Sequence, residues 1–293
     1  MENKENYDRA AKVGGLTYFI AVFALIFLTL IFSLCVSVMN IDKNSLVYCV
    51  LGYAVSPVAL ITTIALGKRF YGGSLSKAIS FNKFSPIYLI PAIILPFSML
   101  LGFGALNELI AGLGLKLNLN VPKQNLPLNS VFDYIILTVF ICIIPAVFEE
   151  AAFRGMIQGF LKNCGALVSF IAVGLCFAFY HLSLFSFVYQ LIFGIILAVL
   201  REKSGSVIPG VIAHFLNNFI NLSLIYFQIP FDFYSPLYIS LGVIVTIVVT
   251  LFIIFYRKKK RQNAVSIKIF WLPFGAVGTV FAGLIAILTA VVK

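Results

Sequence analysis

Nine long apolar stretches occupy most of this chain of 293 residues. A helix needs about 20 consecutive apolar residues to cross the roughly 30 Å hydrocarbon core of a bilayer. The stretches therefore predict an all-α protein, a polytopic transmembrane helical bundle with eight to nine spans. They cover residues 15–39, 46–66, 86–106, 131–161, 165–184, 185–200, 206–225, 236–256 and 269–292.

The composition excludes soluble classes of protein. Hydrophobic residues make up 61% of the chain and charged residues only 11%, against about 25% charged residues in soluble globular proteins. A soluble nucleic-acid binder is excluded even though the net charge is +11, so no nucleic-acid partner is expected. The five cysteines have no paired spacing and predict neither a disulfide framework nor a Cys-x-x-Cys metal site. The first apolar stretch exceeds the apolar part of a signal peptide and is expected to stay as a membrane anchor.

The distribution of positive charge predicts an orientation, because cytoplasmic segments collect Lys and Arg. With the N-terminus in the cytoplasm, seventeen of the 21 Lys and Arg residues fall on the inner side of the membrane. The other four, Lys43, Lys116, Lys123 and Lys293, fall on the outer side. The run from Arg257 to Arg261 is expected to hold the eighth span in place and to bind anionic lipid. With its short polar extensions, the chain is expected in a bacterial inner membrane.

Three polar clusters interrupt the apolar stretches. Charged side chains inside spans are costly and are therefore usually functional, paired or both. The clusters lie in the fourth, fifth and seventh stretches and contain both histidines of the chain and two of its ten acidic residues. They read Glu149-Glu150-Ala-Ala-Phe-Arg154, Phe177-Ala-Phe-Tyr-His181 and His214-Phe-Leu-Asn-Asn218.

Helix geometry indicates which of these side chains can meet. Glu150 and Arg154 are four residues apart and share a helix face, so they can form an ion pair that lowers the cost of burying either group. Glu149 points about 100° away and is left without that partner. His214 and Asn218 also share a face. At 1.5 Å per residue, the three clusters lie about 12 to 24 Å from the inner ends of their helices, so they can meet at one level.

This set of residues fits the hydrolysis of an amide bond inside a membrane. A carboxylate next to an imidazole can take a proton from water. The hydroxide equivalent then attacks a carbonyl carbon, and hydrogen-bond donors must stabilise the resulting oxyanion. Glu149 offers the base, and His214 and Asn218 offer donors on one helix face.

The motifs EExxxR, FxxxH and HxxxN, with GSVIPG shortly before the last, resemble those of the CPBP family of intramembrane proteases. This family includes the type II CAAX prenyl endopeptidases and the Abi bacteriocin-immunity proteins. The resemblance covers about residues 130–224 and implies a CAAX prenyl protease-like core. The expected organisation is spans 1 to 3 with the connecting loop in residues 1–129, the catalytic core with spans 4 to 7 in residues 130–225, and spans 8 and 9 in residues 226–293.

The resemblance also implies an activity and a role for each polar residue of the motifs. The protein would be an intramembrane glutamic endopeptidase that cleaves a peptide or membrane-protein substrate near the cytoplasmic membrane surface. Glu149 would activate water, and His181 would help to position it. Glu150 and Arg154 would form an ion pair that supports both, and His214 with Asn218 would stabilise the oxyanion.

Zinc is the alternative to metal-free catalysis. Glu149, His181 and His214 offer the two-His, one-carboxylate ligand set of a catalytic zinc site, as in a metalloprotease. The HExxH spacing of zincins is absent from the chain. We therefore favour activation of water by glutamate without a cofactor, although both mechanisms fit this residue set.

Three other interpretations fit parts of the pattern. A non-proteolytic bacteriocin-immunity or membrane scaffold protein would bind a peptide or partner protein in the same place without cutting it. An ion or proton transporter would account for buried Glu and His residues, but not for the His and Asn pair. The polar groups can also be interhelical hydrogen bonds that serve packing alone.

Overall fold

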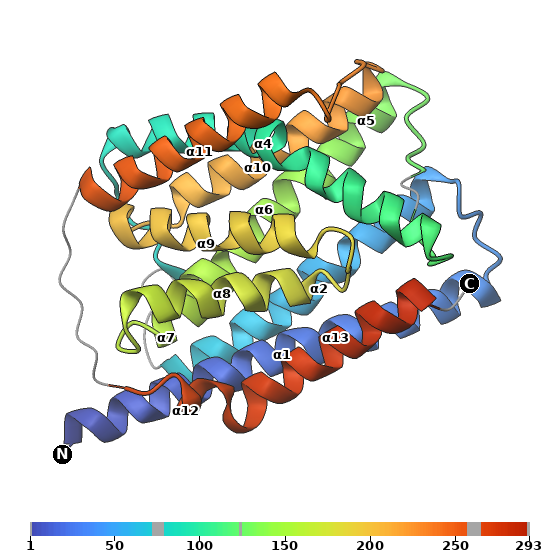
Figure 1. Cartoon of the computed structure of the whole chain (residues 1–293). Helices are drawn as coiled ribbons and strands as arrows, with labels where there is room; N and C mark the ends of the chain where they lie inside the picture. Colours follow the sequence, from blue (N-terminus) through green and yellow to red (C-terminus); the bar gives the residue numbers. More distant parts are fainter. Residues whose placement is uncertain (1, 72–78, 123–124, 257–264, 292–293) are drawn as a thin grey trace.

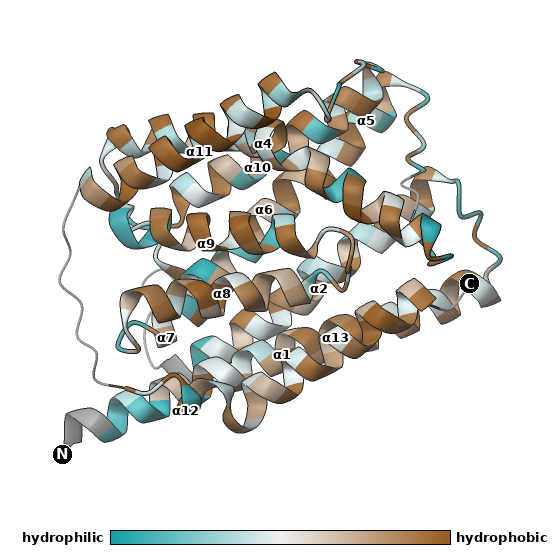
Figure 2. Cartoon of the chain, in the orientation of Figure 1, coloured by the Kyte–Doolittle hydropathy of each residue, from teal (hydrophilic) through white to brown (hydrophobic). Residues whose placement is uncertain are grey.

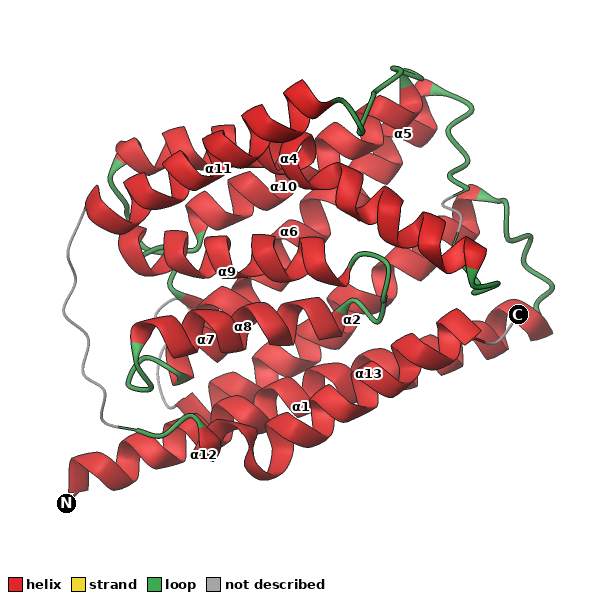
Figure 3. Ribbon diagram, in the orientation of Figure 1, coloured by secondary structure: helices red, strands yellow, loops and turns green. Residues whose placement is uncertain are grey.

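The computed structural model describes residues 2–71, 79–122, 125–256 and 265–291. Within these ranges the regular structure is helical and no strand occurs (Figure 3). The long helices are α1 (Glu2–Val38), α2 (Leu46–Tyr71), α4 (Leu89–Lys116), α8 (Ala166–Tyr180), α9 (Phe187–Ser204), α10 (Ile208–Tyr226), α11 (Pro236–Tyr256) and α13 (Ala276–Val291). The shorter elements are η1 (Pro86–Tyr88), α5 (Val131–Leu137), η2 (Thr138–Ile143), α6 (Ile144–Glu149), η3 (Glu150–Ile157), α7 (Gln158–Phe160), α12 (Lys268–Phe270) and η4 (Trp271–Gly275).

Each of the nine predicted stretches is helical over most of its length, which confirms the all-α bundle. Among the described residues, six helical segments are long and apolar enough to cross a membrane. Of the other predicted spans, α8 and α13 are shorter apolar helices, and α9 carries Arg201, Glu202 and Lys203 at its end. Large apolar side chains such as Leu34, Leu237 and Phe255 face outward, and the outer helix surfaces are largely hydrophobic (Figure 2).

The helices run back and forth between two ends of the bundle (Figure 1). The N-terminus and the turns before α8 and α10 lie at one end, and the C-terminus, the turn between α8 and α9 and the connection before α11 lie toward the other. α1 packs on α2 and α13, α4 packs on α10 and α11, and α8 pairs with α9. The first end carries Lys162, Arg201 and Lys203, three of the charges predicted to be cytoplasmic.

Small residues bring neighbouring helices close together, as is common in membrane bundles. A Cβ atom added at Gly102 of α4 would lie 2.6 Å from the backbone nitrogen of Val243 in α11. The hydroxyl of Thr246 donates to that of Ser98 across the same contact, at 2.9 Å. Between α8 and α9, a Cβ atom at Gly194 would lie 3.1 Å from the Cα atom of Gly174. This close approach places the backbone of α9 against the polar cluster described below.

The fourth apolar stretch is an irregular helix. It runs from Val131 to Phe160, and two π-helical segments, η2 and η3, lie on either side of α6. π-helical segments inside α-helices occur frequently at functional sites. Pro145 lies in the first turn of α6, where it cannot donate a backbone hydrogen bond. The stretch thus exposes polar backbone groups to side chains of other helices just before it reaches Glu149 and Glu150.

Candidate active site

Three helices bring Glu149 and both histidines together. Glu149 is the last residue of α6, His181 directly follows the end of α8, and His214 lies in the first half of α10. The Oε2 atom of Glu149 is 3.7 Å from Nε2 of His181 and 3.9 Å from Nε2 of His214. This oxygen is buried and has no hydrogen-bond partner within the described protein. Two imidazole nitrogens therefore face one carboxylate oxygen.

The second nitrogen of each imidazole fixes the position of its hydrogen. Nδ1 of His181 is 2.8 Å from the backbone oxygen of Phe177, which can only accept a hydrogen bond, so Nδ1 donates. Nδ1 of His214 is 3.0 Å from Oε1 of Glu150, a carboxylate that also accepts from Arg154. In a neutral imidazole with hydrogen on Nδ1, the Nε2 atom is an acceptor. When both imidazoles are neutral, both Nε2 atoms are therefore acceptors close to the Glu149 carboxylate.

The end of α8 explains the orientation of His181. The last carbonyl groups of a helix lack intrahelical partners, and the backbone N–H of His181 donates to Ala178 instead of Phe177. The imidazole of His181 satisfies the Phe177 carbonyl in its place. The next residue, Leu182, has a φ of 51°, a left-handed conformation that turns the chain sharply away from the helix. The sequence predicts His181 for this site, but it does not show that His181 lies at the end of its helix.

The ion pair predicted from the spacing of Glu150 and Arg154 is present and completely buried. Nη1 of Arg154 donates to Oε1 of Glu150 at 2.8 Å, and both side chains are 0% exposed. Nη2 of Arg154 donates to the backbone oxygen of Gly194 in α9 at 3.2 Å. The guanidinium carbon lies 4.1 Å from the centre of the Phe177 ring, a cation–π contact. Arg154 therefore joins the Glu150 carboxylate to α8 and α9.

Phe177 lies at the centre of the cluster. Its ring makes edge-on contacts with His181 and His214, with ring centres 4.6 and 5.7 Å apart. The ring is fully buried. It contacts both imidazoles and the guanidinium group of Arg154 and so helps to define where each of them lies.

Asn218 is hydrogen-bonded to the fourth stretch and to its neighbour in α10. Its Nδ2 atom donates to the backbone oxygen of Ile141 in η2 at 3.1 Å, and its Oδ1 atom accepts from Asn217 at 3.3 Å. Ile141 lies in the π-helical segment η2, so Asn218 joins α10 to this irregular part of the fourth stretch. The hydrogen-bond partner of His214 is Glu150, not Asn218. One of the two amide hydrogens of Asn218 thus bonds to the fourth stretch, and the second does not take part in that bond.

The sequence interpretation missed three polar residues around this cluster. Gln158, four residues after Arg154, is fully buried and donates to the backbone oxygen of Ala198 at 2.8 Å. Tyr189 and Asn217 are also buried and are hydrogen-bonded to each other. The available signal was the one used for the three motifs, a polar side chain inside an apolar stretch. Tyr189 alone does not indicate a functional site, because tyrosine is also enriched at membrane interfaces.

Gly210 makes room for the Glu150 carboxylate. A Cβ atom added at Gly210 in the first turn of α10 would lie 2.9 Å from Oε2 of Glu150. The carboxylate cannot easily move, since its other oxygen is held by Arg154 and His214. Glycine in the GSVIPG segment therefore permits the contact between α10 and η3.

We expect Gly210→Ala to lower the free energy of unfolding by about 1–3 kcal/mol, because the added methyl group overpacks a rigid buried site. Thermal unfolding in detergent measures this change. The matched control is Gly112→Ala in α4, where an added Cβ meets nothing within 4 Å. Since Ala favours helix over Gly, the control should be neutral or stabilising. Equal losses for the two variants would contradict the packing argument.

The donor types at Glu149, His181 and His214 suit zinc, but their spacing does not. Ligands about 2.0–2.1 Å from a tetrahedral zinc ion lie about 3.4 Å from one another, whereas the two Nε2 atoms are 3.7 and 3.9 Å from Oε2. Within the described part of the chain, no group of three His, Cys, Asp or Glu residues is arranged to hold a metal ion. The three atoms thus lie slightly farther apart than the ligands of a formed tetrahedral zinc site.

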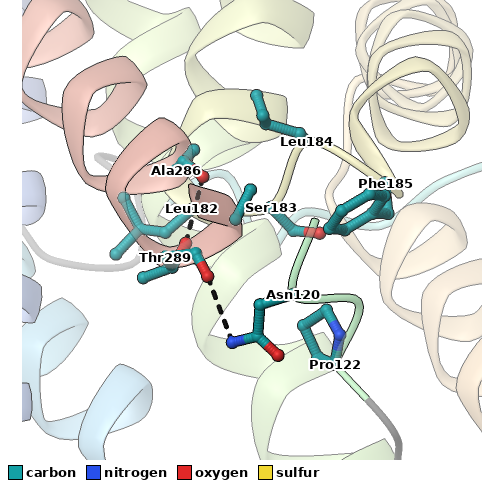
Figure 4. A pocket seen from close by; sticks show the side chains of 9 residues that line it. Asn120, Pro122, Leu182, Ser183, Leu184, Phe185, Ala286 and Thr289 are labelled. Carbon is teal, nitrogen blue, oxygen red and sulfur yellow. Dashed lines mark hydrogen bonds between the residues drawn. The ribbon is translucent and has the colours of Figure 1, made fainter. Parts of the chain in front are cut away.

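The site is most accessible at His181. The side chains of Glu149 and His214 are 8% and 5% exposed, and that of His181 is 23% exposed. A small hollow begins at the next residue, Leu182, and is lined by the turn between α8 and α9, by Asn120 and by the end of α13 (Figure 4). Asn120 donates to the backbone oxygen of Thr289 at 3.3 Å across this hollow.

The comparison with known families gives one match, to the segment that contains this site. Residues 131–220 match the family model described as type II CAAX prenyl endopeptidase Rce1-like. This segment is similar to an Rce1-like domain. All six polar residues of the three motifs lie inside the matched segment, which spans 90 of the 293 residues. No curated protein and no solved structure matches the chain significantly.

The Rce1-like domain confirms the resemblance to the CAAX proteases. Residues 131–220 are thus similar to a family of CAAX-type intramembrane proteases, which act on peptide or protein substrates. Together with the apolar helices, the domain makes the chain an integral, multi-pass membrane protein.

Proposed function

We propose that the protein is a metal-free glutamic endopeptidase in which Glu149 activates the attacking water. The convergence of three hydrogen-bond acceptors, Oε2 of Glu149 and Nε2 of both histidines, is the observation that supports it most. A water molecule donates two hydrogen bonds and fits among acceptors of this kind. Its oxygen then lies next to a carboxylate that can receive its proton.

In the proposed reaction, Glu149 takes a proton from water as the water oxygen attacks the carbonyl carbon of the scissile bond. The carbonyl oxygen becomes an oxyanion, which collapses as the C–N bond breaks, and the proton on Glu149 passes to the leaving nitrogen. His181, held by the Phe177 carbonyl, orients the water through Nε2. The bond between Glu150 and His214 fixes the second imidazole in the same way.

The oxyanion needs donors, and we assign this role to Asn218 because its amide has a hydrogen beyond the one bonded to Ile141. One Nδ2 hydrogen of Asn218 bonds to the Ile141 carbonyl, and the amide has a second. His214 donates to an oxyanion from Nε2 only when both of its nitrogens carry hydrogens, because Nδ1 already donates to Glu150. We therefore assign the neutral donor to Asn218 and a charge-dependent contribution to His214.

A comparison of membrane peptides tests the proposed function. Host membranes are incubated with proteoliposomes that contain either the parent protein or its Glu149→Gln variant, and the peptides released are identified by mass spectrometry. Peptides released by the parent and not by the variant support the endopeptidase, and their ends give the cleavage site. A prenylated peptide with a C-terminal CAAX sequence is the first defined substrate to test, given the name of the matching family. Identical peptide sets would favour the binding or scaffold alternative.

Removal of metal ions tests the zinc alternative. We expect cleavage to be unchanged after dialysis against a strong chelator, because the proposed water is activated by a carboxylate alone. The rate of cleavage and the zinc content of the purified protein are measured before and after dialysis. A loss of activity that added zinc restores would reject the metal-free mechanism.

The placement of the protein in its membrane is also a proposal. We propose a cytoplasmic N-terminus in a bacterial inner membrane, so that cleavage occurs near the cytoplasmic surface, and we retain the predicted catalytic core at residues 130–225. The turn before α8 and the end of α9, which contain Lys162, Arg201 and Lys203, lie at the same end of the bundle as the N-terminus. This supports the proposed orientation, because cytoplasmic segments collect Lys and Arg. The proposed anionic-lipid site, Arg257 to Arg261, lies outside the described residues.

A further inference from the structure

Three hydrogen bonds in series connect α9 to η2 through two adjacent asparagines of α10. The Tyr189 hydroxyl lies 2.5 Å from Oδ1 of Asn217. Nδ2 of Asn217 lies 3.3 Å from Oδ1 of Asn218, and Nδ2 of Asn218 lies 3.1 Å from the backbone oxygen of Ile141. Neither Tyr189 nor Asn217 belongs to the three motifs.

The direction of this series is fixed at one end. The Ile141 carbonyl can only accept, so Asn218 must turn its NH₂ group toward it and its oxygen toward Asn217. Asn217 must then donate to that oxygen, which leaves its own oxygen facing Tyr189. Only a donor satisfies this oxygen, and the tyrosine hydroxyl has one hydrogen to give. In each of the three hydrogen bonds, the donor therefore lies on the Tyr189 side and the acceptor on the Ile141 side.

Burial makes this direction costly to reverse. Tyr189 is 6% exposed and Asn217 is 8% exposed. An amide turned the wrong way would place two oxygens or two NH₂ groups against each other, away from water. Without the Tyr189 hydroxyl, the oxygen of Asn217 has no donor in this series and the amide loses its preferred orientation.

We propose that Tyr189 and Asn217 are positioning residues that hold the amide of Asn218 with its NH₂ group toward the Ile141 carbonyl, and that this fixes the direction of its second amide hydrogen. This inference rests on the proposed function, in which the second amide hydrogen of Asn218 stabilises the oxyanion. It assigns a role in cleavage to a residue of α9, a helix that contains none of the three motifs.

Cleavage kinetics test whether Tyr189 acts through Asn218. The substrate is a quenched fluorescent peptide built on a sequence that the parent cleaves and Glu149→Gln does not. Tyr189→Phe should lower kcat about 3- to 10-fold with KM unchanged, as expected for the loss of one orienting hydrogen bond. In an Asn218→Ala background, the same change should alter kcat by less than about twofold, because its target is gone. The matched control is Tyr134→Phe. It removes a hydroxyl of α5 that is hydrogen-bonded to Ser223 of α10, the helix of Asn218, at 2.9 Å, and it should leave kcat unchanged.

Unfolding measurements test the hydrogen bond itself without any substrate. Tyr189→Phe should lower the unfolding temperature of the parent but not that of an Asn217→Leu variant, which has no amide to satisfy. Equal effects in the two backgrounds would show that the hydrogen bond is absent. An undiminished effect of Tyr189→Phe on kcat in the Asn218→Ala background would overturn the positioning role. If the parent and Glu149→Gln cleave alike, the proposed function fails and the positioning role with it, while the unfolding result still reports the hydrogen bond.

Discussion

Glu149→Gln is expected to reduce kcat by about 10²- to 10⁴-fold, the usual cost of removing a general base. Glutamine has nearly the same shape as glutamate, so the contacts of α6 should persist. The amide cannot accept a proton from water as the carboxylate does. Its NH₂ group can instead donate to one of the two Nε2 acceptors, which lie 3.7 and 3.9 Å from the present oxygen, and would occupy the place of the water. Cleavage of the fluorescent peptide and thermal unfolding of the variant are measured together.

The control for this variant is another glutamate in an apolar helix. Glu108 of α4 is exposed and lies outside the polar cluster. Glu108→Gln removes the same charge and should leave both kcat and the unfolding temperature unchanged. A Glu149→Gln protein that folds normally and cleaves at the parent's rate would exclude Glu149 as the base.

Hydropathy and helix geometry were sufficient to predict the bundle and the ion pair. The apolar stretches are long, so the length of a bilayer crossing identifies them with little ambiguity. Glu150 and Arg154 are four residues apart on one helix, and their contact requires only local geometry. The meeting of Glu149 with the two histidines rested on matching depths in three helices, and in the structure these side chains lie together.

The partners of His214 and Asn218 could not be predicted in this way. Sharing a helix face suggests that these two side chains lie side by side, but it does not say what each one bonds to. His214 bonds to Glu150 because Gly210 allows η3 to approach α10 closely. Asn218 bonds to the backbone oxygen of Ile141, which lies in the π-helical segment η2. Both outcomes depend on how separate helices pack and on π-helical segments, which hydropathy does not report.

Arg154→Met is expected to lower the free energy of unfolding by about 3–5 kcal/mol, the typical cost of leaving a buried charge without its partner. The change removes the donor to Glu150, the donor to the Gly194 carbonyl and the cation over the Phe177 ring. The carboxylates of Glu149 and Glu150 would then lie close together without a neighbouring cation. Denaturant or thermal unfolding in detergent measures the loss, and cleavage should fall with it because Glu150 no longer holds His214 in a fixed place.

The double variant Glu150→Gln/Arg154→Met distinguishes the effect of an uncompensated Glu150 charge from the loss of the other contacts of Arg154. Removing both charges of a buried ion pair costs much less than removing one, so the double variant should recover most of the lost stability. The amide oxygen that replaces the carboxylate can still accept from Nδ1 of His214, so part of the activity should return as well. If the double variant is as unstable as Arg154→Met alone, the loss comes from the contacts of Arg154 with Gly194 and Phe177 and not from an uncompensated Glu150. Recovery of stability without activity would instead show that the charge of Glu150 acts on His214 in the reaction.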